Sequence, residues 1–233
     1  MKKIYSVAIY PSPDIIDLVK TMKGYLRSKI EWYNSCNSTA HITICEFELD
    51  ASELEKLKQK LSEICNTFTP FQVYLDHFDS YDNAGAFFIG LNEDPTPIKP
   101  KIKKTQKAPV STTKKVAKPN QSIEKPIEKK TVEKPTEDLI VKTKLKTLMK
   151  KTQEGLKISR MKKSNDPHIT IGRKLSLEKI KIASEIFTNI ERKFLCKEMV
   201  LREFDPLLKQ FVVIDTFPFG SNPEPEFVQG SLF

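Results

Sequence analysis

Hydrophobic and polar positions along the chain follow two periods, one typical of strands and one typical of helices. Ile4–Tyr10 is a short run rich in β-branched and aromatic residues that ends at a proline-rich turn, so it is predicted to be a strand. Ala40–Phe47 and Pro167–Arg173 are predicted strands in which isoleucine alternates with His and Thr. The remaining apolar runs divide into helices and hairpins.

Helical spacing of apolar residues predicts four helices. Ser52 and Glu55 fit a capping box at the start of the second helix, and Ser176 fits the N-cap of the fourth. The four segments are centred on Ile15–Leu26, Leu54–Ile64, Val141–Met149 and Leu177–Ile190.

Two hairpins complete the pattern, one from Phe71 to Leu91 and one from Glu198 to Phe217. Each half of the chain therefore runs helix, His-Ile-Thr-Ile strand, capped helix and hairpin. This order predicts an internal duplication and an α+β fold of two lobes, residues 1–94 and 137–233, related by a pseudo-twofold axis and forming one bilobal domain.

A segment of different composition separates the two halves. Residues 95–136 contain 12 Lys, three Glu and seven Pro, with no aromatic residue and no Leu. This segment carries a net charge of +9, equal to that of the whole chain, so the remaining residues are balanced. We expect a disordered Lys/Pro-rich insertion that serves as a solvated linker, with weak contact to RNA phosphates as the alternative.

The rest of the composition is typical of a reduced, cytoplasmic protein. The sequence has no apolar stretch long enough to span a membrane, and its four cysteines have no C-x-x-C spacing. We expect a monomer with no cofactor and no metal.

Two of the three histidines open the identical word His-Ile-Thr-Ile, at His41 and His168. Because side chains on a strand alternate between faces, His41 shares a face with Thr43, and His168 shares a face with Thr170. The isoleucines point to the opposite face. Under the pseudo-twofold, two imidazoles and two hydroxyls meet across a cleft between the lobes.

This set of side chains suits phosphodiester chemistry without a metal. A histidine can act as base or acid near neutral pH, one imidazole removing a proton from water and the other protonating the leaving oxygen. Threonine hydroxyls can donate to the non-bridging oxygens as negative charge develops. The identity of the base and of the acid stays open at this point.

The paired words resemble the H-x-T-x signature of the 2H phosphoesterase superfamily. Pro167-His168-Ile169-Thr170-Ile171-Gly172-Arg173 is similar to the P-H-h-T-L-A-R motif of the RNA 2′,3′-cyclic phosphodiesterases, also called the 2′-5′ RNA ligase family. The resemblance covers nearly the whole chain outside residues 95–136. The first motif departs from that family, because Cys45-Glu46-Phe47 replaces its usual Phe-Leu-Gly ending.

The resemblance implies a two-lobed fold with antiparallel sheets flanking a cleft and helices outside. It implies His41 and His168 as the catalytic pair, and Thr43, Thr170 and Arg173 as contacts to substrate. The implied activity is a hydrolase that opens the 2′,3′-cyclic phosphate of an RNA terminus or a nucleotide. A 2′-5′ phosphodiesterase or RNA ligase, and an idle RNA-binding module, remain alternatives.

Further side chains are weaker candidates for the cleft. Strict alternation puts Arg173 on the isoleucine face, so a twist or bulge is needed to bring it to the histidine face. Cys45 and Phe47 follow His41 at even spacing, although core packing is the favoured interpretation for both. His77 has no counterpart in the second half and is predicted to be a solvated hairpin residue.

Overall fold

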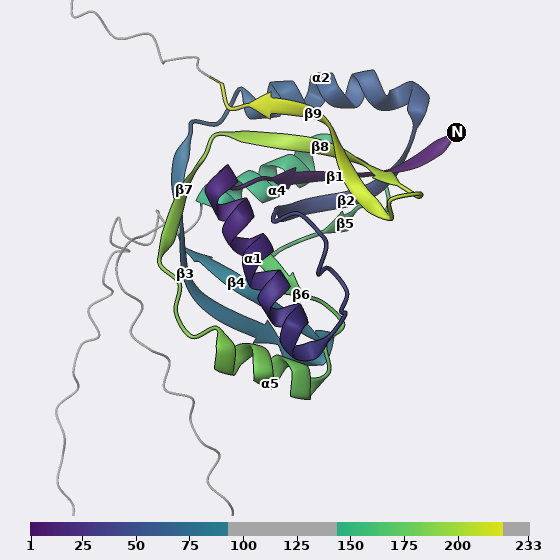
Figure 1. Cartoon of the computed structure of the whole chain (residues 1–233). Helices are drawn as coiled ribbons and strands as arrows, with labels where there is room; N and C mark the ends of the chain where they lie inside the picture. The colour runs from purple at the N-terminus through teal and green to yellow at the C-terminus, as the bar shows by residue number, and fades with distance from the viewer. Residues whose placement is uncertain (93–143, 221–233) are drawn as a thin grey trace, which may run out of the picture.

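The computed structural model describes residues 1–92 and 144–220, which form two antiparallel sheets with helices packed on them (Figure 1). The predicted disordered insertion, residues 95–136, lies outside the described residues. The strands are β1 Lys2–Ile9, β2 Ile42–Asp50, β3 Phe71–Tyr81, β4 Ala86–Asn92, β5 Lys162–Lys163, β6 His168–Gly172, β7 Arg192–Cys196, β8 Glu198–Asp205 and β9 Gln210–Pro218.

The helices cover the outer faces of the sheets. They are α1 Pro13–Ile30, α2 Leu54–Cys65, α4 Lys144–Leu156 and α5 Leu177–Ile186. Helix α1 starts with a proline in its first turn, where the missing N–H costs nothing, and it buries Ile15, Val19, Leu26 and Ile30 on one face. Helices α2 and α4 contact each other, and α1 contacts α5 and β6.

Each sheet contains strands from both halves of the chain. The larger sheet, sheet A, has the order β5-β2-β1-β8-β9, and the smaller sheet, sheet C, has the order β6-β4-β3-β7. The structural repeat therefore starts with β1 and again with β4. Strand β3 of the first repeat pairs with β4 of the second, and β8 of the second repeat pairs with β1 of the first. The boundaries 1–94 and 137–233 divide the sequence but not the sheets, because β3 and β4 belong to different repeats.

This repeat also relocates the Lys/Pro-rich insertion. In the chain it comes between β4 and α4 of the second repeat. In the first repeat, the equivalent connection between β1 and α1 has only three residues, Tyr10–Ser12. The predicted unit of helix, strand, helix and hairpin is thus shifted by one strand. The reason is that the sequence identifies the β3–β4 hairpin but does not show whether its two strands belong to one repeat or to two.

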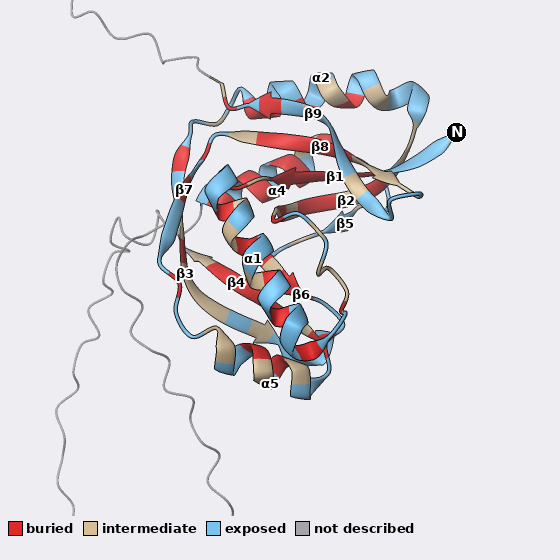
Figure 2. Cartoon of the chain, viewed as in Figure 1, coloured by how far each residue is buried: buried red, intermediate tan, exposed pale blue. Residues whose placement is uncertain are grey.

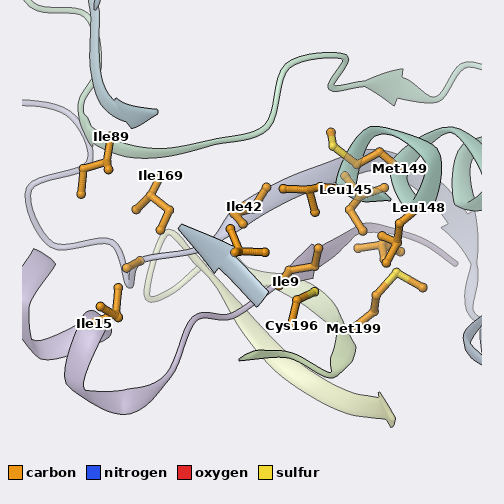
Figure 3. Packing of buried hydrophobic residues seen from close by; sticks show 14 of the residues in the cluster. Ile9, Ile15, Ile42, Ile89, Leu145, Leu148, Met149, Ile169, Cys196 and Met199 are labelled. Carbon is orange, nitrogen blue, oxygen red and sulfur yellow. The ribbon is translucent and has the colours of Figure 1, made fainter. Parts of the chain in front are cut away.

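One hydrophobic cluster extends through both sheets (Figure 2). Ile9 pairs with Ile42 in sheet A, and the equivalent pair in sheet C is Ile89 with Ile169. All four are fully buried. Figure 3 shows these pairs with side chains from α1, α4 and β8, and their packing makes the two sheets one core.

Local features differ from the sequence prediction at one helix start. The capping box of Ser52 and Glu55 is wrong, because Asp50 accepts from the Ser52 backbone and caps a short 3₁₀ turn, Ala51–Glu53. Helix α2 then continues from that turn without a side-chain cap. The Ser176 cap is confirmed, since its hydroxyl accepts from Lys179 N. Strands β5 and β7 were not predicted, because β5 consists of two lysines and β7 of only five residues.

Gly85 tests the joint between the two repeats. It closes the β3–β4 turn at φ 64°, and its carbonyl accepts from Leu175 N at 2.9 Å. An added Cβ would lie 2.6 Å from Leu175 O, so Gly85→Ala is expected to lower the free energy of unfolding by about 2 kcal/mol or more. Urea denaturation measures this.

Gly24→Ala is the matched control. Gly24 lies inside α1 with no neighbour within 4 Å of an added Cβ. Alanine there should raise stability by roughly 0.5–1 kcal/mol, because glycine is a poor helix former. Equal effects of the two substitutions would contradict the role assigned to the β3–β4 turn.

Candidate functional site

Both motif histidines are held by a backbone carbonyl two residues earlier in the chain. His41 immediately precedes β2, and its Nδ1 lies 2.7 Å from the carbonyl oxygen of Thr39. His168 opens β6, and its Nδ1 lies 2.9 Å from the carbonyl oxygen of Asp166. A carbonyl can only accept, so Nδ1 donates in both rings and Nε2 keeps the lone pair of the neutral imidazole. Both half-buried rings are thus prepared for proton transfer at Nε2.

The two threonines occupy equivalent places on the strands. Thr43 pairs with Ala8 across β1, and Thr170 pairs with Phe88 across β4. Both threonines are half-buried, whereas the isoleucines between them are fully buried. Each hydroxyl therefore lies on the same face as its histidine, as the alternation predicted.

A β-bulge follows the threonine in both motif strands. The register shifts so that Ile44 in β2 and Ile171 in β6 have no direct partner. One extra residue reverses which face the later side chains take. Cys45 and Phe47 consequently lie in the core, at 0% and 3% exposure, and Glu46 takes their place on the histidine face.

The second bulge acts on Arg173. Because of the bulge, Gly172 points to the core and Arg173 is exposed on the histidine face. Strict alternation without a bulge would have put Arg173 on the isoleucine face. Its backbone N–H donates to Asn34 O at 3.1 Å, in the segment that leads to His41. Ser35 Oγ also donates to the Ile171 carbonyl, at 3.3 Å. These bonds tie the second motif to the first.

Three cations surround His41 and keep it neutral. Burial is the main cause that lowers its pKa to about 3, and the charges of Arg202, Lys23 and Arg173 lower it further. The bond to the Thr39 carbonyl acts in the opposite direction but is outweighed. His41 is therefore a neutral imidazole at physiological pH.

Arg202 was not identified from the sequence, although it lies directly across the sheet from the first motif. It pairs with Ser6 in β1 and is 2% exposed. Its Nη2 donates to Ser6 Oγ at 2.7 Å, and its guanidinium carbon lies 5.9 Å from the Tyr10 ring centre and 5.1 Å from that of Phe211. Among the described residues its Nε has no hydrogen-bond partner.

Lys23 is a second cation that the sequence did not reveal. It lies on the buried face of α1, in line with the apolar residues Val19 and Leu26. Its ammonium donates to the backbone oxygen and the hydroxyl of Ser38 at 2.7 and 2.9 Å. Burial, and then the charge of Arg173, lower its pKa to about 8.

The charged group beside His168 is an anion, whereas those around His41 are cations. The pKa of His168 is also lowered, because burial outweighs the carbonyl bond and the negative charge of Asp166, which both act to raise it. The Asp166 carboxylate accepts a hydrogen bond from the Tyr81 hydroxyl. The rings of Phe88 and Tyr81 lie 4.7 and 5.9 Å from the imidazole. The two histidines thus have equivalent backbone geometry and different electrostatics.

Other features of the site concern metals, thiols and membranes. Within residues 1–92 and 144–220, no three His, Cys, Asp or Glu side chains are grouped to hold a metal ion. All four cysteines are free thiols. None of the helices that the structure describes is long and apolar enough to cross a membrane.

The sequence matches no protein-family model and no curated protein. Solved structures, however, share its fold over 94% of this chain and 99% of theirs. Protein TT0787 of Thermus thermophilus has 13% identity and a TM-score of 0.52, and a phosphoesterase has 13% and 0.51. E. coli LigT complexed with 3′-AMP has 14% and 0.51. At these identities the likeness is one of fold, and it confirms the predicted α+β architecture with two antiparallel sheets.

The charge of Arg202 should be measurable in the titration of His41. Arg202→Gln is expected to raise the His41 pKa toward the ordinary value of ~6.5, because it removes a positive charge that opposes protonation. Proton NMR of the imidazole signals measures this, since the chain has only three histidines.

Arg202→Lys is the control that keeps the charge, and it should leave the His41 pKa low. The His168 pKa should not move in either variant, because Arg202 is not among the groups that shift it. A His41 pKa that is unchanged in Arg202→Gln contradicts the electrostatic role of Arg202.

Proposed function

We propose that this protein is a metal-independent phosphodiesterase that opens the 2′,3′-cyclic phosphate of RNA ends or nucleotides by two-histidine acid–base catalysis. The observation that carries the proposal is the pair of imidazoles that are held at Nδ1 by equivalent carbonyls and have a threonine in register. Acid–base catalysis of this kind needs two imidazoles in opposite protonation states near neutral pH.

The electrostatic difference supports a role for each histidine. His41, kept neutral by burial and neighbouring cations, is the base that removes a proton from the attacking water. His168 is proposed as the acid that protonates the leaving ribose oxygen, because the carbonyl bond and the negative charge of Asp166 act against the lowering of its pKa by burial. Water oxygen bonds to phosphorus as one ring P–O bond breaks, and the proton gained at His41 and the one lost at His168 are exchanged with solvent.

The remaining predicted residues suit the phosphate. Thr43 and Thr170 are proposed to donate hydroxyl hydrogen bonds to the non-bridging oxygens as charge increases in the transition state. Arg173, turned to the histidine face by its bulge, is proposed to bind the phosphate or the nucleotide. The neighbour E. coli LigT is complexed with 3′-AMP, which supports a nucleotide as the ligand class.

The charge balance favours a small or terminal substrate. Outside residues 95–136 basic and acidic residues are equal in number, which gives little attraction for a long RNA. A 2′-5′ phosphodiesterase or RNA ligase uses the same groups with a different bond or in the reverse direction, and an idle RNA-binding module needs neither histidine.

Turnover of 2′,3′-cyclic mononucleotides and of a short RNA with a cyclic phosphate end tests the proposal. Activity should persist in EDTA, and His41→Ala and His168→Ala should each lower kcat by about 10²-fold or more, because each removes an acid–base group. Lys20→Ala, at an exposed position of α1, is a control for a substitution outside the proposed binding and catalytic residues. A wild-type protein that binds these RNAs but leaves the cyclic phosphate intact supports the idle module instead.

The assignment of base and acid can be tested with a substrate whose leaving group needs no proton. Nitrophenolate leaves as an anion, so cleavage of bis(p-nitrophenyl) phosphate should be nearly normal in His168→Ala and remain impaired in His41→Ala. The comparison is the ratio of kcat values on this ester and on the cyclic nucleotide. Rescue of His41→Ala in place of His168→Ala would reverse the two roles.

A further inference from the structure

The two sheets differ most beside their histidines, where one has a tyrosine and the other a glycine. The repeat aligns Tyr10, which follows β1 and whose ring lies 6.3 Å from that of His41, with Gly90 in β4, which pairs with His168. In sheet A the tyrosine ring fills the space next to the imidazole. In sheet C the His77 ring takes the space over Gly90, and a pocket of about 220 Å³ lies beside that ring.

His77, which the sequence predicted as a solvated hairpin residue, lies in the β3–β4 hairpin with its side chain 42% exposed and forms one wall of this pocket. It pairs with Gly90, so His168, Gly90 and His77 form one row across the sheet. A Cβ at Gly90 would lie only 2.0 Å from Nε2 of His77, which shows that the His77 ring leans over the glycine toward His168. The Asp76 carboxylate lies against Nδ1, so Nε2 is the nitrogen directed over Gly90.

The next row supplies a carboxylate where sheet A has an apolar side chain. Asp79 pairs with Phe88, which in turn pairs with Thr170. The equivalent row in sheet A is Val200, Ala8 and Thr43. Asp79 is exposed, and its Oδ1 accepts from the Ser80 backbone at 2.8 Å, which orients the carboxylate.

Aromatic rings and a second carboxylate complete the pocket. The rings of Tyr81 and Phe88 lie 4.6 Å apart, and the Tyr81 hydroxyl donates to Asp166. Because Asp166 also holds His168 through its carbonyl, this wall is joined to the candidate acid. The lining residues are His77, Asp79, Tyr81, Phe88, Gly90, Leu91, Asp166 and Pro167.

The chemistry of this lining selects a class of ligand. Two carboxylates disfavour a phosphate and accept hydrogen bonds from N–H and O–H groups. Aromatic faces favour a planar ring, which they can stack. The volume is below the roughly 300–1,000 Å³ of sites for drug-sized molecules, so a single base fits better than a whole nucleotide.

We propose that this pocket binds the nucleobase of the nucleotide whose ribose oxygen His168 protonates, and that Asp79 selects bases with an exocyclic amino group. The selection rests on the carboxylate, which accepts from the amino group of cytosine but faces the O4 acceptor of uracil. The proposal deepens the proposed function, because it places the leaving nucleoside on the side of the acid.

Paired cyclic nucleotides that differ only in this group provide the test. Wild type should turn over 2′,3′-cyclic CMP with a kcat/KM about tenfold above that for 2′,3′-cyclic UMP, the size expected for one hydrogen bond to a charged group. Asp79→Asn should bring the ratio close to one, since the amide keeps the bond to Ser80 but presents donors as well as an acceptor. Asp17→Asn, an exposed aspartate on α1, should leave the ratio unchanged.

Binding separates this proposal from the catalytic one. Calorimetric titration with cytidine and uridine 2′-monophosphates should show the same preference, also in the inactive variant His168→Ala. Selective binding without turnover in wild type overturns the phosphodiesterase and keeps the pocket. Turnover with equal kcat/KM for the two nucleotides, or a preference that survives Asp79→Asn, overturns the pocket.

Discussion

The exchange of strands between the two repeats is the constraint on which the other features of this structure depend. Strand β8 of the second repeat pairs with β1 of the first, and β3 of the first pairs with β4 of the second. Neither sheet can form from one repeat alone, so each histidine lies on a sheet completed by the other repeat. Residues from both halves of the chain therefore contribute to the surroundings of each imidazole.

Strand exchange also explains how two identical motifs acquire different electrostatics. The local geometry, with a carbonyl at Nδ1 and a bulge after the threonine, is set within each motif and is the same twice. The strands across the sheet differ, since β8 supplies Arg202 in sheet A and β3 supplies Tyr81 at the equivalent place in sheet C. The carboxylate beside His168 comes from Asp166, which accepts from the Tyr81 hydroxyl. The two histidines therefore differ in their neighbours, with cations around His41 and a carboxylate beside His168.

The sequence predicted the features that depend on neighbouring residues. Isoleucine alternating with His and Thr identified both motif strands and the face that each histidine takes, and the repeated word indicated the duplication. The bulges were not predictable, because an unpaired Ile44 or Ile171 has no sequence pattern that distinguishes it from a paired one. Arg173 could be placed correctly only once the bulge was seen.

Features that depend on pairing between distant strands could not be predicted either. Arg202 lies 196 residues from Ser6, its hydrogen-bond partner, and nothing near either residue indicates the contact.

A comparison of equivalent positions in the two repeats separates what the two motifs share from what differs between them. On the histidine face, the residues that both repeats share are the His and Thr of each motif, and they serve the proposed chemistry by presenting Nε2 beside a hydroxyl. Wherever the two repeats differ, as Tyr10 differs from Gly90 and Val200 from Asp79, the difference distinguishes one side of the phosphate from the other. A phosphodiester is itself unsymmetrical, with water on one side and a nucleoside on the other. In the proposed reaction, the tyrosine-filled space beside His41 suits the small water molecule, and the pocket beside His77 suits the nucleoside whose oxygen is protonated.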